Sequence, residues 1–128
     1  MRFLLDTHVL LWALNAPERL ADAIRIEIED PDNVVLFSTA SIWEIATKSR
    51  LARFDFAVRT DQIANEVVTR GFGELMIRWQ AAAAVAYLPL HHREPFDRIL
   101  LAQAMTEPMH LYTVDRKLVR YSPLVRLV

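Results

Sequence analysis

The sequence predicts an α/β fold: a three-layer α/β/α sandwich with a central, mostly parallel β-sheet. Short apolar runs rich in β-branched residues alternate along the chain with longer segments whose apolar residues recur at helical spacing. The short runs are apolar on both faces, which is typical of parallel strands covered by helices on both sides. In such folds the ligand site lies at the carboxyl ends of the strands, so residues that follow each strand are the first candidates for function.

The first half of the chain alternates between strand and helix patterns. Residues 2–5 (RFLL) predict a short buried strand, and a helix is expected from Val9 to Leu14. Apolar residues at helical spacing predict a further helix over residues 18–30. The run VVLFS (34–38) has the composition and length of a strand, and TASIWEIATKSR (39–50) predicts the helix that follows it.

The second half continues the alternation. An amphipathic helix is expected over residues 60–70, where Gly71 ends it, and an alanine-rich helix over 78–87. Pro95 begins another helix, since proline is favoured at the first helical position. The remaining elements are short: strands over 74–77, 110–114 and 124–128, and a helix from Asp115 to about Val119.

Composition indicates one folded domain that spans residues 1–128. Hydrophobic residues make up 53% of the chain and charged residues 24%, and no low-complexity tract or linker divides it. The absence of cysteine excludes disulfides, cysteine-ligated zinc and thiol catalysis. Asp6, Thr7 and His8 interrupt the first apolar run, which excludes a secretory signal peptide, and no run is long enough for a membrane span. We therefore expect a soluble, cytoplasmic protein with no membrane partner.

Charge and glycine content limit the function classes. The net charge is −1, so no overall positive field attracts nucleic acid, although 13 of the 15 basic residues are arginine, which suits phosphate contacts. A GC-rich genome explains the arginine bias equally well. The only glycines are Gly71 and Gly73, which excludes a phosphate-binding P-loop.

Four acidic residues are expected at one edge of the sheet. Asp6 ends the first strand and Asp115 follows the strand at 110–114; Glu44 and Asp97 lie in the early turns of their helices. Each has an ordinary explanation as a helix cap, a first-turn acid or, for Glu44, an ion pair with Lys48 four residues on. Four caps have no reason to share one edge, so we interpret them together.

The surroundings of these acids favour a cation. Glu44 and Asp97 lie among apolar residues, where an uncompensated carboxylate is costly. Mg²⁺ takes oxygen ligands, usually one or two carboxylates together with water and phosphate oxygens. The sequence thus predicts a site for a hard divalent cation.

Four segments carry a resemblance to a known family. LLDTHVLLW, SIWEIATKSRL, HHREPFDRILLAQA and LYTVDRKLVRY resemble PIN-domain proteins, and more closely the VapC-type toxin ribonucleases of bacterial and archaeal toxin–antitoxin pairs. The match covers essentially the whole chain in order. One departure is visible: the usual RDPFD reads REPFD here, with Glu94, which we take to lie outside the acidic quartet.

The resemblance implies a Mg²⁺- or Mn²⁺-dependent endoribonuclease. The matching acids Asp6, Glu44, Asp97 and Asp115 form its metal and catalytic site, and the hydroxyl of Thr113 supports it. The protein would be the toxin of a type II pair that cleaves structured RNA such as tRNA and inhibits translation. It also implies a homodimer and a cognate antitoxin whose tail covers the acidic site.

Residues around the predicted site have further expected roles. Thr7 begins a helix or orients an acid, His8 packs or makes a helix-terminal hydrogen bond, and His91 and His92 lie in a solvated loop. Exposed grooves for an antitoxin peptide are expected around Leu10, Leu11, Trp12 and the helix that bears Trp43. The RNA contacts are expected from basic residues near the acids: Lys48, Arg93, Arg98 and Arg116, with Lys117, Arg50 and Arg53 as further candidates.

Three other classes remain as alternatives. A dehalogenase-type phosphatase has a second acid two residues after the first, where this chain has His8. A phosphoacceptor domain also gathers acids at strand ends but does not need Glu44 on a helix. A catalytically inactive PIN-like interaction module is the main rival, and only an activity measurement separates it from the nuclease.

Overall fold

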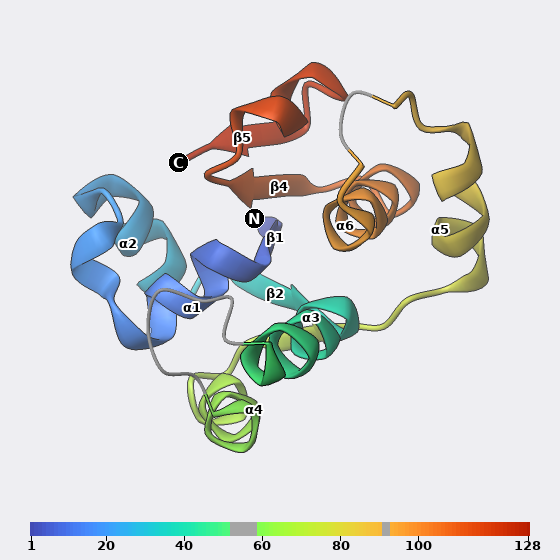
Figure 1. Cartoon of the computed structure of the whole chain (residues 1–128). Helices are drawn as coiled ribbons and strands as arrows, with labels where there is room; N and C mark the ends of the chain where they lie inside the picture. The colour runs from blue at the N-terminus through green and yellow to red at the C-terminus, as the bar shows by residue number, and fades with distance from the viewer. Residues whose placement is uncertain (52–58, 91–92) are drawn as a thin grey trace.

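The computed structural model describes residues 1–51, 59–90 and 93–128 (Figure 1). In this part of the chain a five-stranded parallel sheet has the order β3-β2-β1-β4-β5. The predicted α/β/α class with a parallel sheet is confirmed. The strands are β1 (Arg2–Leu5), β2 (Val34–Ser38), β3 (Gly73–Leu75), β4 (His110–Thr113) and β5 (Val125–Leu127).

The helices follow the predicted alternation with local differences. They are α1 (Thr7–Asn15), α2 (Asp22–Glu29), α3 (Thr39–Arg50), α4 (Thr60–Thr69), α5 (Trp79–Ala84) and α6 (Pro95–Thr106), with 3₁₀ turns η1 (Pro17–Arg19), η2 (Val85–Tyr87) and η3 (Arg116–Arg120). Gly71, with φ of +76°, ends the segment after α4 as expected, since glycine adopts this conformation without strain.

The prediction of one helix over residues 18–30 is wrong at its start. Leu20 has extended backbone angles (φ −93°, ψ 143°) between η1 and α2, and its side chain is buried in the core. Burial of this leucine is a tertiary contact that overrides the local helical spacing.

Alternating side chains of the strands supply two separate cores. Phe3 and Leu5 of β1 pack with α1, α2, α3 and α4 on one face of the sheet, whereas Leu4 packs with α5, α6 and η3 on the other. Figure 1 shows the helices on both sides of the sheet. Leu10 and Leu11 of α1 are fully buried, so the exposed groove expected around them is wrong. No helix of the described residues is long and apolar enough to cross a membrane.

The strand order creates a switch point at the centre of the sheet. After β1 the chain moves outward through β2 and β3, and it returns to add β4 on the other side of β1. The Asp6 N–H donates to the Tyr112 carbonyl at 2.9 Å, so the ends of β1 and β4 stay paired up to Asp6. Ligands of open α/β sheets bind at such a point, outside the carboxyl ends of the strands.

Arg98 of α6 supports the fold through loop carbonyls. Its side chain is 8% exposed, and its guanidinium donates to the carbonyls of Pro89 at 2.8 Å and of Val85 and Leu88 at 3.1 Å. These bonds attach the segment after α5 to the first turn of α6. Arg98 was expected to contact RNA because it is a basic residue near the acids; the structure instead turns its side chain inward onto loop carbonyls, which gives it a role in the fold.

Replacement of Arg98 by methionine should destabilise the protein. The carbonyls of Val85 and Leu88 would lose this donor, whereas that of Pro89 would keep the Tyr121 hydroxyl, and we expect the free energy of unfolding to fall by about 2 kcal/mol. Chemical denaturation at pH 7 measures the change. Arg93→Met is the matched control, because Arg93 is exposed near the same end of α6 and its loss should change stability by less than about 0.5 kcal/mol. Equal stability of the two variants would contradict this role of Arg98.

Candidate active site

The four predicted acids lie around one cleft. A cavity of about 510 Å³ opens at the carboxyl ends of β1 and β4. Its lining residues in the described part of the chain are Asp6, His8, Glu44, Lys48, Asp97, Val114, Asp115, Arg116 and Lys117. The convergence of the acids at one sheet edge, expected from the sequence, is observed. Their roles in binding and catalysis stay a prediction.

Asp6 is buried directly after the central strand. One carboxylate oxygen accepts a hydrogen bond from the Val9 N–H at 2.8 Å, so Asp6 also caps α1. The other oxygen accepts from the Thr113 hydroxyl at 2.5 Å. Burial raises the pKa of Asp6 to about 6; the Asp97 charge adds to the rise, while the hydrogen bonds of Thr113 and Val9 and the nearby His8 oppose it.

Thr113 ties the ends of the two central strands together. Its hydroxyl oxygen accepts the Asp115 N–H at 3.0 Å, which leaves the hydroxyl proton to be donated to Asp6. Asp115 in turn accepts from the Lys117 N–H at 2.9 Å and caps η3. The capping roles weighed for Asp6 and Asp115 are thus real, and both residues also line the cleft.

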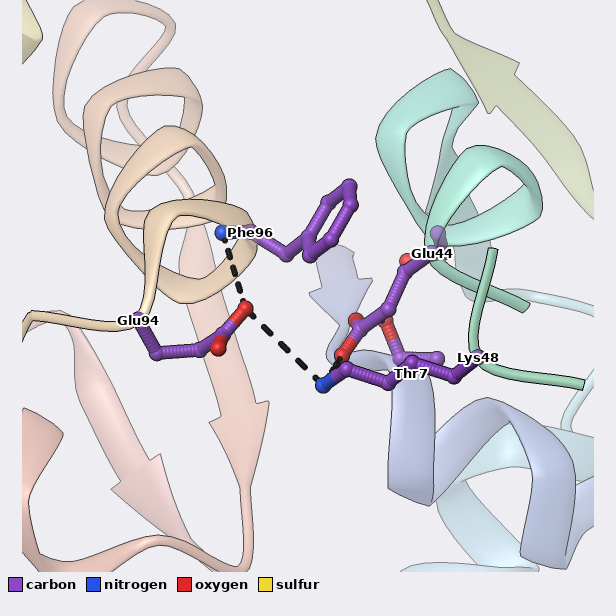
Figure 2. Close-up of polar contacts among 6 residues, drawn as sticks. Thr7, Glu44, Lys48, Glu94 and Phe96 are labelled. Carbon is purple, nitrogen blue, oxygen red and sulfur yellow. Dashed lines mark hydrogen bonds and ion pairs between the residues drawn. The ribbon is translucent and has the colours of Figure 1, made fainter. Parts of the chain in front are cut away.

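Glu44 is held from two sides (Figure 2). Its side chain comes from the middle of α3 and is only 3% exposed. One oxygen accepts the Thr7 hydroxyl at 2.5 Å, and Thr7 is also hydrogen-bonded to Ser41 at 3.0 Å. The other oxygen forms an ion pair with Lys48 one turn on. Thr7 therefore orients Glu44 rather than Asp6.

The start of α6 forms the opposite wall. Pro95 begins the helix as predicted, and Asp97 lies in its first turn. Glu94 caps the helix by accepting the Phe96 N–H at 3.2 Å, and the same oxygen lies 3.8 Å from Lys48 Nζ. Figure 2 shows Lys48 between Glu94 of this wall and Glu44 of α3. Glu94 thus takes part in the site's charge network, although the sequence interpretation set it aside.

The donor set suits a hard divalent cation. The cleft offers carboxylate oxygens from β1, α3, α6 and the end of β4, and none of its lining residues is cysteine. Within the described residues, no three acidic or histidine side chains lie close enough to enclose an ion by themselves. Mg²⁺ commonly keeps several waters and uses one or two carboxylates, which is compatible with acids spread over the cleft walls.

Apart from Arg98, which serves the fold, the predicted RNA contacts and the two loop histidines fall into three groups. Lys48, Arg116 and Lys117 line the cleft, and Lys48 pairs with acids there. Arg93 and Arg50 are exposed and are not among the described lining residues. Arg53, His91 and His92 lie outside the described residues. His8 lines the cleft and packs edge-on against Trp12, with ring centroids 6.5 Å apart, which agrees with its expected packing role.

Sequence reasoning missed the residues that hold the acids. Thr7 and Ser41 were not assigned to Glu44, because the contacts join positions 37 and 34 residues apart. For Glu94 a local signal was present. Pro95 marks the first position of α6, so the residue directly before it, Glu94, occupies the capping position.

The fold and the site together define a class of protein. It is an α/β protein with an acidic cleft at the switch point of a parallel sheet. The sequence pattern of the PIN domain matches residues 3–123, so the chain belongs to the PIN domain family.

Individual relatives agree with this assignment. The chain is 32% identical over 119 residues to Ribonuclease VapC22 of Mycobacterium tuberculosis (strain ATCC 25618 / H37Rv), covering 90% of this chain and 88% of the relative. The fold of the present chain is similar to that of a chain in the crystal structure of VapBC2 from Rickettsia felis bound to a DNA fragment from their promoter. There the TM-score is 0.72 at 15% identity, over 100% of this chain and 98% of that one. The DNA-bound VapBC of Salmonella typhimurium gives a TM-score of 0.69 at 17% identity, over 100% and 97%.

The raised pKa of Asp6 predicts how metal-free stability changes with pH. An acid whose pKa is higher in the folded than in the unfolded state loses stability as pH rises from its ordinary value of 3.8 through about 6. Asp6→Asn removes this loss, so in EDTA its melting temperature should exceed that of the wild type at pH 7.5, with a smaller gain at pH 4.5. Asp22→Asn, an exposed first-turn acid of α2, is the control. A gain that does not depend on pH would contradict the prediction.

Proposed function

We propose that this protein is a Mg²⁺- or Mn²⁺-dependent endoribonuclease and the toxin of a type II toxin–antitoxin pair. The observation that carries the proposal is the meeting of Asp6, Glu44, Asp97 and Asp115 around one cleft at the switch point of a PIN fold. Support also comes from the relative named Ribonuclease VapC22, which matches nearly the full length of both chains.

The acids have distinct roles in this proposal. Asp6, Asp97 and Asp115 hold the cation most directly, and Glu44 binds it directly or through water, or orients the attacking water. Thr113 is a positioning residue: its hydroxyl donates to Asp6 and fixes the orientation of that carboxylate beside the cleft. Asp6 ionises fully only above its raised pKa, so binding of a cation favours the charged form.

The chemistry is hydrolysis of a phosphodiester bond. A bound divalent ion supplies a water nucleophile at neutral pH and neutralises charge on the phosphate and on the leaving oxygen. In-line attack by water leaves a 5′-phosphate and a 3′-hydroxyl. Arg116 and Lys117 lie on the cleft wall beside Asp115, where they bind the RNA backbone and set its register.

The substrate is structured cellular RNA such as tRNA, and its cleavage inhibits translation. Sequence-specific proteins read unstacked bases in RNA loops, and an open cleft admits such a loop. The site of action is the cytoplasm, which agrees with a chain that contains no cysteine.

The partners are a second copy of the chain and a cognate antitoxin. An apolar groove of about 350 Å³ lies between α3, α5 and α6; we call it the Trp43 groove, and Trp43, Ile77, Ala82, Val85, Pro95, Phe96 and Ile99 line it. Trp43 is 62% exposed, and its ring packs edge-on against Phe96, one residue before Asp97. An amphipathic antitoxin tail fits here, with an apolar side chain in the groove and a basic one at the acids.

The proposal predicts metal-dependent cleavage. Purified protein should cleave a tRNA mixture in Mg²⁺ or Mn²⁺ and stop in EDTA, and the products should carry 5′-phosphates. Asp97→Asn and Asp6→Asn should each lower the rate at least about 100-fold, because each removes a ligand charge at the reacting centre, while circular dichroism stays unchanged. Equal cleavage in EDTA would contradict the metal mechanism, and no cleavage of any RNA would favour the inactive interaction module.

Metal binding should be visible in stability without a known substrate. Mn²⁺ should raise the melting temperature of the wild type with the logarithm of its concentration above Kd. Asp97→Asn should be at least as stable as the wild type in EDTA, because it relieves repulsion with Asp6, and should respond less to Mn²⁺. The prediction is contradicted if Asp97→Asn melts at a lower temperature than the wild type and neither protein responds to Mn²⁺. Asp97 would then be an ordinary first-turn acid that contributes about 0.3–1 kcal/mol to stability.

The proposed assembly is tested by light scattering. A homodimer should give twice the chain mass of 14.8 kDa at micromolar concentration. A monomer under these conditions would contradict the dimer but not the nuclease.

A further inference from the structure

Lys48 sits between carboxylates that belong to opposite walls of the cleft. Its ammonium pairs with Glu44 of α3 and lies 3.8 Å from Glu94, the residue that caps α6 (Figure 2). The Phe96 ring is also close, with its centroid 5.8 Å from Nζ. The Lys48 side chain is only 20% exposed, so this is an enclosed network rather than a surface ion pair.

This arrangement engages both carboxylate oxygens of Glu44. One oxygen accepts from Thr7 and the other is paired with Lys48. A carboxylate so deeply buried needs such compensation, because an unpaired charge in this place is strongly destabilising. The same pairing places a cation where the proposed function requires a divalent ion to act.

We propose that Lys48 is an internal counter-ion that occupies the cation position beside Glu44 until a divalent ion binds, and that Glu94 is the positioning residue that receives Lys48 afterwards. The inference rests on the proposed metal-dependent function. In this role Lys48 competes with the metal for the Glu44 carboxylate. Glu94 lowers the free-energy cost of separating Lys48 from Glu44.

Glu94 is suited to receive the ammonium. Lys48 Nζ is already 3.8 Å from its Oε1, so a short shift completes the pair. The carboxylate is held in place by the Phe96 N–H at 3.2 Å. Lys48 can therefore leave Glu44 without being transferred unpaired to solvent, and the Phe96 face offers a further favourable contact.

Mn²⁺ affinity, measured by isothermal titration calorimetry on the folded protein, tests the inference. Lys48→Met should bind Mn²⁺ about tenfold more tightly, because the competing ammonium is gone. Glu94→Gln should bind about tenfold more weakly, since its amide oxygen keeps the cap on α6 but no longer attracts Lys48. In the Lys48→Met background, Glu94→Gln should have little effect.

Two controls separate this role from general effects. Glu107 lies at the other end of α6, has 26% side-chain exposure against 30% for Glu94, and forms an ion pair with Arg78 at 3.9 Å. Its replacement, Glu107→Gln, should leave Mn²⁺ affinity unchanged. Glu94→Asp keeps both charge and cap and should restore most of the affinity. Lys48→Gln, whose amide still donates to Glu44, replaces Lys48→Met if the latter does not fold.

A metal-free measurement provides an independent check. In EDTA, Lys48→Met should lower the melting temperature by several degrees, because Glu44 loses its counter-ion, and adding Glu44→Gln should recover most of the loss.

Four results would overturn the inference. Weaker Mn²⁺ binding by Lys48→Met would show that Lys48 does not compete. If Glu94→Gln weakened Mn²⁺ binding equally in the wild-type and Lys48→Met backgrounds, Glu94 would act on the metal through long-range electrostatics and not through Lys48. A wild type that binds no Mn²⁺ overturns the proposed function as well, whereas normal wild-type binding with unchanged variants overturns this inference alone.

Discussion

Burial of the Asp6 carboxylate at the end of the central strand is the constraint on which the rest of the site depends. β1 is covered on both faces, so the residue after it enters a largely desolvated place. The fold compensates with the Val9 N–H of the following helix and with the Thr113 hydroxyl of the neighbouring strand. Both donors exist only because β1 leads directly into α1 and because β4 is paired beside β1. The strand order therefore supplies the hydrogen-bond donors that the buried Asp6 carboxylate needs.

The same requirement accounts for the second buried acid. Glu44 receives a hydroxyl from the first residue of α1 and an ammonium from its own helix, so α1 and α3 are joined through its carboxylate. The Glu44 carboxylate is thus compensated by one hydroxyl donor and one lysine, whereas the charge of Asp97 still raises the pKa of Asp6.

The two walls of the cleft are attached to the fold in different ways. Asp6 and Thr113 make backbone hydrogen bonds to neighbouring strand ends, Asp115 bonds through its N–H to the Thr113 hydroxyl, and Asp97 stands on a helix that Arg98 attaches to the loop after α5. Lys48 pairs with acids on both walls, with Glu44 of α3 and with Glu94 at the start of α6.

The sequence by itself determined the α/β class, the five strands, the start of α6 at Pro95 and the gathering of four acids at one edge. These follow from local signals: the apolar runs, the proline at a helix start and the position of each acid relative to the nearest strand end. Only the tertiary structure decided that Leu20 breaks a helix, that Arg98 turns inward, and which charged groups Thr7, Thr113 and Glu94 contact. The physical reason is distance along the chain, since Thr113 meets Asp6 across 107 residues and Thr7 meets Glu44 across 37. Such contacts depend on strand order and on which way a side chain turns, and no local pattern in the sequence specifies either.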